Sequence, residues 1–184
     1  YKCTYCSQRM LTGTTYRYKS AERIVEELSI LVNQYGQTQI VFYDDNFCFK
    51  AKRVIDVCEA IMRAGLHEKC AFSVQTRADN FPPDLVPILA KAGFRHAGFG
   101  METGVDRLAR LIGKGETVAQ HMAAVALAKK HGFDVSLFMI YGLPTETLAE
   151  RETSYRVVQS ARVEASKYNN LIPYPGTPIF NDLK

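Results

Sequence analysis

Residues 39–46, Gln-Ile-Val-Phe-Tyr-Asp-Asp-Asn, are the stretch that decides the fold. The part up to Tyr43 is short and dominated by β-branched and aromatic side chains, which is typical of a buried strand. Asp44, Asp45 and Asn46 then end the apolar run, as polar residues do where a strand passes into a loop. Helical patterns lie on both sides of this segment, so the sequence predicts alternating strands and helices.

The same alternation continues along the chain, as judged from the spacing of apolar residues and the positions of glycine and proline. The order calls for a parallel sheet with right-handed crossovers, which both a doubly wound sheet and a (β/α) barrel satisfy. Counting the first strand, five strands are visible, fewer than the eight of a full barrel. Further strands are predicted at residues 71–75, 95–101, 134–141 and 166–172, and helices at 20–33, 51–64, 82–92, 105–112, 117–131 and 148–163.

Composition and charge limit the class of protein. A chain of 184 residues with 47% hydrophobic residues can bury the core of one domain. The formal charge of +4 comes from lysines and arginines spread along the sequence, so a nucleic acid partner is not indicated. No apolar run approaches the roughly 20 residues that span a bilayer, and we expect a cytoplasmic protein. Because Tyr1 is not methionine and stands directly before a cysteine motif, we also expect a piece of a longer protein.

Polar residues and glycine follow successive predicted strands at their carboxyl ends. In a parallel α/β sheet the loops after the strands converge, and ligands bind there. Charged side chains that recur at this edge predict a binding site for a small ligand carrying both charges and hydroxyl groups. The residues concerned are Asp44 and Asp45 after the first strand, Arg77 after the second, Glu102 after the third, and Gly142 with Glu146 after the fourth.

Cys3 and Cys6 form a C-x-x-C pair, which zinc sites, redox dithiols and iron–sulfur sites share. A four-ligand zinc site needs two more ligands at close spacing, and the four histidines, expected at the surface or at helix ends, offer none. A redox dithiol normally opens a helix, whereas residues 7–18 are polar and loop-like. An iron–sulfur cluster is the better interpretation, given another thiolate. The remaining cysteines are expected to be ordinary core residues: Cys48, Cys58 and Cys70.

The stretch Tyr1-Lys2-Cys3-Thr4-Tyr5-Cys6-Ser7 resembles the end of the C-x-x-x-C-x-x-C motif of the radical S-adenosylmethionine (SAM) superfamily. In that family three cysteines hold three irons of a 4Fe–4S cluster, and the amino and carboxylate groups of SAM chelate the fourth. The resemblance implies that Cys3 and Cys6 are cluster ligands and that the first cysteine would lie two residues before Tyr1. It also implies that Tyr5 shields the cluster and lies near the adenine.

Two further segments resemble parts of the family's sequence that bind the amino and carboxylate groups of SAM. Residues 41–47, Val-Phe-Tyr-Asp-Asp-Asn-Phe, look like the F-x-D-D-x-F segment of one branch of the family. Asp44 or Asp45 would then accept hydrogen bonds from the SAM amino group. Residues 75–79 look like the end of the family's third strand, where Arg77 would pair with the SAM carboxylate through two parallel donors.

Segments later in the chain carry the resemblance toward the nucleoside. Residues 98–104 are similar to the G-x-E-S-G segment, in which Glu102 would take the ribose hydroxyls, with Lys114 in the segment that follows. Residues 139–147 are similar to the G-x-P-G-E-T segment near the adenine, although Thr145 stands where glycine is usual. The resemblance implies that Gly142 and Pro144 of this segment bind SAM. Residues 173–178 match the P-Y-P-G-T-P that the family has after its sixth strand.

The resemblance is strongest to the branch with an N-terminal cobalamin-binding domain, which includes the anaerobic magnesium-protoporphyrin ester cyclases. It implies an α/β fold, a partial (β/α)6 TIM-like barrel of parallel strands with the first strand missing or truncated, and one radical SAM core domain over residues 1–184. The implied function is reductive cleavage of SAM to a 5′-deoxyadenosyl radical by the 4Fe–4S cluster, serving methylation or tetrapyrrole ring oxidation. Implied partners are a small-molecule or tetrapyrrole-like substrate, an electron donor such as flavodoxin or ferredoxin, and cobalamin bound outside this chain.

Simpler interpretations of the same residues stay open. Asp44 and Asp45 could cap the next helix, and Arg77 could form an ion pair with Asp79 or Glu102. Glu102 could equally be a negative charge placed before a helix N-terminus. For the whole chain, the second hypothesis is a non-catalytic α/β nucleotide-binding module whose C-x-x-C holds zinc or acts as a redox dithiol.

Overall fold

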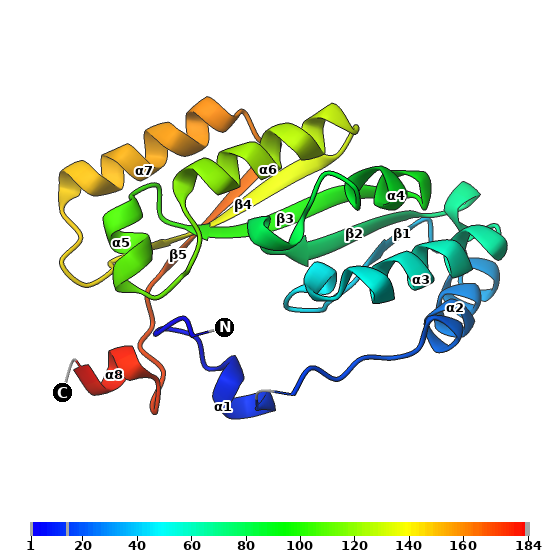
Figure 1. Cartoon of the computed structure of the whole chain (residues 1–184), viewed down its shortest axis with the longest axis horizontal. Coiled ribbons are helices and arrows are strands. Elements are labelled where there is room, and N and C mark those ends of the chain that lie inside the picture. The colour runs from blue at the N-terminus through cyan, green and yellow to red at the C-terminus, as the bar shows by residue number, and fades with distance from the viewer. Residues whose placement is uncertain (1, 14, 183–184) are drawn as a thin grey trace.

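The computed structural model describes residues 2–13 and 15–182, so Tyr1 of the cysteine motif lies outside the described residues. Five parallel strands follow one another in the order β1-β2-β3-β4-β5, and each strand pairs with the one before it. The order never reverses, as it would in a doubly wound sheet, and the sheet curls into a half-barrel (Figure 1). The predicted partial TIM-like barrel is confirmed. The strands are β1 (Gln39–Val41), β2 (Ala71–Thr76), β3 (Phe94–Glu102), β4 (Asp134–Tyr141) and β5 (Ala165–Asn170).

Helices connect the strands, and three of the longer ones begin at side-chain caps. The Ser20 side chain accepts a hydrogen bond from the backbone N–H of Arg23, and Thr117 and Thr147 each form a capping box with the residue three positions later. The α-helices are α1 (Gln8–Thr12), α2 (Ala21–Ser29), α3 (Ala51–Arg63), α4 (Val86–Lys91), α5 (Asp106–Leu111), α6 (Val118–Lys130), α7 (Leu148–Ala161) and α8 (Pro178–Asp182), with a π-helical turn at Ile30–Gln34 and 3₁₀ turns at Phe47–Phe49, Leu66–Glu68 and Ala78–Asn80. No helix in the described part of the chain is both long enough and apolar enough to cross a membrane.

Two predictions about local structure are wrong. The helix predicted at residues 82–92 begins only at Val86, because Pro87 has no backbone N–H that could donate to the carbonyl of Pro83. The backbone N–H of Leu85 instead donates to the carbonyl of Pro82 in a turn, at 3.0 Å. The segment at residues 7–18, predicted to be a loop, contains α1 directly after the cysteines. The absence of such a helix was one reason to prefer an iron–sulfur site to a redox dithiol, and that reason no longer holds.

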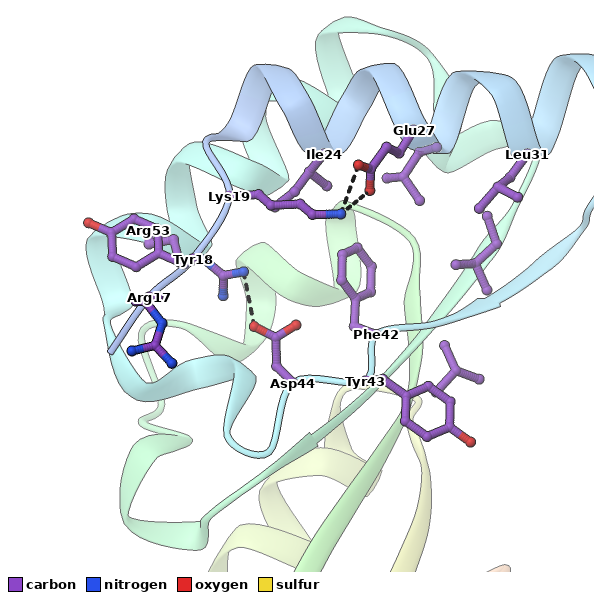
Figure 2. Close-up of a pocket in the computed structure, with 13 residues that line it drawn as sticks. Arg17, Tyr18, Lys19, Ile24, Glu27, Leu31, Phe42, Tyr43, Asp44 and Arg53 are labelled. Atoms are coloured by element: carbon purple, nitrogen blue, oxygen red, sulfur yellow. Dashed lines mark hydrogen bonds and ion pairs between the residues drawn. The ribbon is translucent and has the colours of Figure 1, made fainter. Parts of the chain in front are cut away.

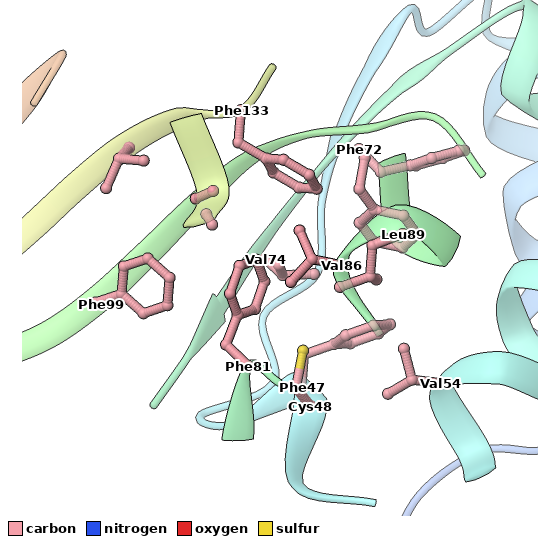
Figure 3. Packing of buried hydrophobic residues seen from close by; sticks show 14 of the residues in the cluster. Phe47, Cys48, Val54, Phe72, Val74, Phe81, Val86, Leu89, Phe99 and Phe133 are labelled. Carbon is pink, nitrogen blue, oxygen red and sulfur yellow. The ribbon is translucent and has the colours of Figure 1, made fainter. Parts of the chain in front are cut away.

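The main core lies between the sheet and the helices on its outer face. Along β2 every second side chain is buried, so Phe72 and Val74 face the helices while their neighbours face the interior of the half-barrel. The ring of Phe94 packs against those of Phe47 and Phe72, with centroids 5.5 Å and 5.4 Å away. Figure 3 shows Phe47 and Phe72 within this core. Each buried phenylalanine contributes about 1.5–3 kcal/mol through the apolar area removed from water. This core fixes the sheet and leaves the carboxyl ends of the strands free for function.

The three later cysteines belong to this core, as predicted. Cys48, Cys58 and Cys70 are all buried, and Figure 3 shows the sulfur of Cys48 among aromatic and aliphatic side chains. Burial raises the pKa of Cys48 and of Cys58 to about 12, because a thiolate is poorly solvated there. These thiols stay protonated at neutral pH and are unsuited to hold a metal.

Candidate active site

The cysteine segment lies across the carboxyl ends of the strands, held by contacts to elements far away in the sequence. The backbone N–H of Thr4 donates to the carbonyl of Ile112 after α5 at 2.9 Å, and the N–H of Ile179 in α8 donates to the carbonyl of Thr4 at 3.2 Å. At the start of α1, the Gln8 side chain donates to Asp45 after β1, at 2.9 Å. Figure 1 shows the first residues of the chain beside α8 below the sheet. The segment is thus fastened at both ends of the half-barrel.

Cys3 and Cys6 stand on one turn of this segment. The backbone N–H of Cys6 points to the carbonyl of Cys3 at 3.4 Å, so the two thiols come from the same tight loop. Both are free and partly exposed, in contrast to the three core cysteines. Within residues 2–13 and 15–182, no group of three or more histidine, cysteine, aspartate and glutamate side chains is arranged to hold a metal ion. The loop therefore presents two accessible thiols to the edge of the sheet.

Tyr5, between the two cysteines, connects their loop with β3. Its ring packs against a small apolar cluster of Leu108, Ile112 and Leu143, and its hydroxyl lies beside the carboxylate of Glu102. Burial raises the pKa of Tyr5 above its ordinary value, and the negative charge of Glu102 raises it further. The phenol therefore stays protonated beside Glu102.

Glu102 occupies a strained position at the end of β3. A register irregularity between Gly100 and Glu102 interrupts the pairing with β4, and the backbone of Glu102 is left-handed, with φ of 67°. A non-glycine residue in this conformation costs of the order of 1–3 kcal/mol, and such strain concentrates at functional sites. A β-carbon at Gly100 would lie 2.6 Å from Oε1 of Glu102 and 3.3 Å from Nζ of Lys114. The glycine therefore makes room for this pair of side chains.

A row of buried charged side chains extends from Glu102 toward β2. Lys114 Nζ lies 3.2 Å from Glu102 and 3.4 Å from Glu116 Oε2, and Glu116 Oε2 lies 3.1 Å from Arg77 Nη2. The exposed fraction of the side chain is 0% for Glu116, 6% for Lys114 and 8% for Arg77. The guanidinium of Arg77 also donates two hydrogen bonds to Asp79, both at 2.9 Å. For Arg77, then, the structure has the ion pair that the sequence offered as an alternative.

His121 on α6 lies at the end of this row of charges and, like His96 within β3, is not at the surface site or helix end expected for it. Expected at the surface or a helix end, it is only 2% exposed, and its Nε2 lies 3.7 Å from Glu116 Oε2. Burial, together with the nearby charges of Lys114 and Arg77, lowers the pKa of His121 to about 3. The ring is therefore neutral at physiological pH.

Asp44 and Asp45, adjacent in sequence, have different surroundings. Asp44 forms an ion pair with Arg53 of α3 at 3.1 Å, and the Arg53 side chain is only 7% exposed. Asp45 is exposed, and the contact described for its carboxylate is the Gln8 side chain of the cysteine segment. Neither residue caps the next helix, because α3 begins at Ala51 after Lys50. Of the two carboxylates, Asp45 is the one presented toward the cysteines.

The loop after β4 borders the other side of Tyr5. Gly142 has φ of 80°, and its N–H donates to Glu146 at 2.7 Å. Thr145, which stands where the related segment has glycine, adopts the left-handed conformation with φ of 60°. Arg107 of α5 holds it there by donating to its hydroxyl and its carbonyl, both at 3.0 Å. The turn geometry therefore survives the replacement of glycine, and Pro144 stays half-buried beside Leu143.

A separate groove of about 360 Å³ lies between α2 and β1 (Figure 2). Ile24, Leu31 and Phe42 form its apolar side, and Figure 2 shows the carboxylate of Asp44 directed toward Arg53. Of the strand-end residues predicted to bind a ligand, Asp44 is the one that lines this groove. The groove is thus distinct from the edge where the cysteine segment lies.

The structure brings together most of the predicted site. Cys3, Cys6, Tyr5, Glu102 and Lys114 meet at one place, with the loop of Gly142 and Pro144 on one side and Asp45 on the other. Arg77 is connected to these residues through Glu116, which also pairs with Lys114. The sequence analysis missed Glu116 and His121. For Glu116 a signal existed, since it follows Lys114 by two positions, but nothing local predicts the burial of His121.

The sequence also matches known proteins. Residues 1–158 match the Radical SAM superfamily. An uncharacterised methyltransferase of Pyrococcus horikoshii is 33% identical over 180 residues, which make up 98% of this chain and 39% of the relative. The anaerobic magnesium-protoporphyrin IX monomethyl ester cyclase of Cereibacter sphaeroides is 27% identical over 186 residues, covering 100% of this chain and 30% of the cyclase. The chain therefore spans between 30% and 39% of the length of these relatives.

The fold has solved counterparts. The radical SAM methyltransferase TsrM of Kitasatospora setae, solved with cobalamin and a [4Fe–4S] cluster bound, superposes with a TM-score of 0.88. The match covers 97% of this chain and 36% of that one, at 20% identity. The half-barrel is thus the fold of a radical SAM core. The family match and the relative from Pyrococcus horikoshii show that this chain belongs to the radical SAM superfamily of enzymes.

Proposed function

We propose that this chain binds SAM across the carboxyl ends of its strands, beside a 4Fe–4S cluster held in part by Cys3 and Cys6. The observation that carries the proposal is the contact between Tyr5 and Glu102, which joins the cysteine loop to the end of β3. A ligand lying against Glu102 is therefore next to the cysteines. When bound, the reduced cluster supplies the electron that cleaves SAM to methionine and a 5′-deoxyadenosyl radical.

The thiols fit a cluster better than a complete zinc site. Cys3 and Cys6 are partly exposed and lie on one turn, so they can share one metal centre, but in the described part of the chain no further ligands join them to make the four of a structural zinc site. We propose that the third thiolate is the upstream cysteine of the superfamily motif. Tyr5 and the apolar cluster around Leu108 and Leu143 would exclude water from one side of the centre.

The proposed SAM contacts follow the surroundings of each side chain. Asp45 would accept from the SAM amino group, because the carboxylate of Asp44 is committed to Arg53. Glu102 would accept from the ribose hydroxyls, and Gly142 with Pro144 would line the adenine. We assign Arg77 a supporting role, since its guanidinium is engaged by Asp79 and Glu116.

The charge of the site suits a cationic sulfonium. Three carboxylates, those of Asp79, Glu102 and Glu116, face two cations, those of Arg77 and Lys114, so the buried group carries one net negative charge. A sulfonium ligand is favoured near such a charge because the surroundings are poorly screened. A neutral or anionic nucleoside would be stabilised less by this negative charge.

For the whole enzyme we propose a small-molecule or tetrapyrrole-like substrate and a cobalamin-binding domain outside this chain. The relatives include a methyltransferase and a protoporphyrin ester cyclase, and the solved counterpart TsrM contains cobalamin, which supports this class of reaction. We propose flavodoxin or ferredoxin as the electron donor. Both methyl transfer and ring oxidation fit these relatives.

The decisive experiment is anaerobic reconstitution of the full-length protein with iron and sulfide, followed by reduction in the presence of SAM. We expect iron–thiolate absorption and release of 5′-deoxyadenosine. Cys6→Ser should abolish both, because it removes a ligand. The matched control Cys70→Ser changes a core thiol and should keep both. A protein that binds one zinc, no iron and releases no 5′-deoxyadenosine would instead support the non-catalytic nucleotide-binding module.

A further inference from the structure

Glu116 is the one fully buried carboxylate in the row of buried charges described above, and its partners there are Arg77, Lys114 and Asp79. Its side chain has an exposed fraction of 0% and lies between the cations of Arg77 and Lys114, at 3.1 Å and 3.4 Å. Its other oxygen accepts a hydrogen bond from the backbone N–H of Asp79, at 3.1 Å. A buried charge is tolerated only with such partners, so the side chain is held in one place.

Lys114 is shared between two carboxylates. Its ammonium lies 3.2 Å from Glu102 and 3.4 Å from Glu116, and its side chain is only 6% exposed. The hydroxyl of Tyr5 also lies beside the carboxylate of Glu102. Without Glu116, the ammonium of Lys114 would pair with Glu102 alone. The carboxylate oxygens of Glu102 would then be less able to accept hydrogen bonds from the hydroxyl groups of a ligand.

The neighbouring groups His121 and Asp79 do not replace Glu116 as the second partner of Lys114. His121, at 3.7 Å, is neutral, and the Asp79 carboxylate is engaged by Arg77 through two hydrogen bonds. Without the negative charge of Glu116, the ammonium of Lys114 and the guanidinium of Arg77 would also repel each other in a poorly screened interior.

We propose that Glu116 is a positioning residue that holds Lys114 away from full pairing with Glu102, so that Glu102 keeps an acceptor for the ribose hydroxyls of SAM. The proposal rests on the proposed function, because it assumes that Glu102 binds SAM. Glu116 acts through Lys114 and does not touch the ligand. Its removal should therefore weaken SAM binding with little effect on the cleavage step.

The test is Glu116→Gln in the reconstituted full-length enzyme, since glutamine keeps the shape and the contact to Asp79 but removes the charge. We expect the dissociation constant of SAM, measured by calorimetry, to rise about tenfold, while kcat for SAM cleavage changes less than about twofold and iron content stays the same. Glu164→Gln is the matched control, because Glu164 also pairs with a lysine and accepts a backbone N–H, but near the start of β4. It should leave SAM affinity unchanged.

A double variant separates positioning from a general loss of structure. In a Lys114→Met background, Glu116→Gln should change SAM affinity less than about twofold, because the residue through which it acts is gone. An equal tenfold loss in both backgrounds, or unchanged affinity in the single variant, would overturn the proposal. If the unaltered enzyme neither binds nor cleaves SAM, the proposed function itself fails, and this result is distinct from the other two.

Discussion

At the scale of single residues, strain and charge are concentrated where β3 ends. Glu102 keeps a left-handed backbone without being glycine, and Tyr5 and Lys114 both contact its carboxylate. These contacts offset a conformational cost of about 1–3 kcal/mol. The neighbouring Gly100 leaves the space in which the pair with Lys114 forms. The strain therefore places a carboxylate toward the cysteine loop.

Substitution of Asp44 and of its neighbour Asp45 should have opposite effects on SAM binding and on stability. Asp45→Asn should weaken SAM binding about tenfold and change stability by less than about 0.5 kcal/mol, because the side chain is exposed. Asp44→Asn should leave SAM binding within about twofold but destabilise the protein by about 1–3 kcal/mol, since buried Arg53 loses its anion. Calorimetric titration with SAM and chemical denaturation measure the two effects. If Asp44→Asn weakens SAM binding and Asp45→Asn does not, the assignment is reversed.

At the scale of elements, the turn between β4 and α7 shows how a helix start and a strained residue cooperate. Thr147 caps α7 in a capping box with Glu150, and Arg107 donates to both Glu150 and Thr145. The guanidinium of Arg107 lowers the pKa of Glu150 to about 2. One arginine of α5 thus fixes the first turn of α7 and the left-handed residue before it.

Thr145 allows the strain in this turn to be measured. Thr145→Gly should be more stable than Thr145→Ala by about 1 kcal/mol, because only the alanine keeps a β-carbon at a φ of 60°. The same two substitutions at Thr153, inside α7, form the control, and there alanine should be the more stable by about 1 kcal/mol. Chemical denaturation of the four variants gives the differences. Alanine favoured at both positions would show that residue 145 is not strained.

At the scale of the whole molecule, the cysteine loop depends on a close approach between the start of the chain and the loop after α5. Gly113 has φ of 65°, and a β-carbon there would lie 2.9 Å from the carbonyl oxygen of Lys2. Thr4 is held nearby by the carbonyl of Ile112. Contacts more than 100 residues apart in the sequence therefore position the two thiols.

Gly113 and Gly115 form a matched pair for this contact. Both have a left-handed backbone, but a β-carbon at Gly115 would meet nothing closer than Arg77 at 3.9 Å. Both alanine variants should lose about 1 kcal/mol of stability from the backbone conformation. Only Gly113→Ala should displace the cysteine loop, and we expect it to bind less than about half the iron of the unaltered full-length protein on reconstitution. Equal iron contents in the two variants would contradict this role of the loop contact.

Local features of the sequence predicted the elements well because they act over a few positions. The strand at Asp134–Tyr141 was predicted with the bounds that the structure has, and the helix start at Ser20 follows from its capping side chain. The helix start predicted at Pro82 and Pro83 is wrong, since Pro87, which has no N–H to donate, is the proline that stands in the first turn of α4.

The sequence by itself determined the alternation of strands and helices, the core role of three cysteines and the strand ends at which polar residues gather, because periodicity and turn chemistry are local. Only the tertiary structure decided the partners of those residues. Arg77 and Lys114 lie 37 positions apart, yet the guanidinium donates to the Lys114 carbonyl, and Glu116 pairs with both. Likewise Asp44 is bound by Arg53 while Asp45 faces the cysteine segment. Ion pairs and burial depend on which surfaces the curled sheet brings together, and no pattern along the chain records that distance.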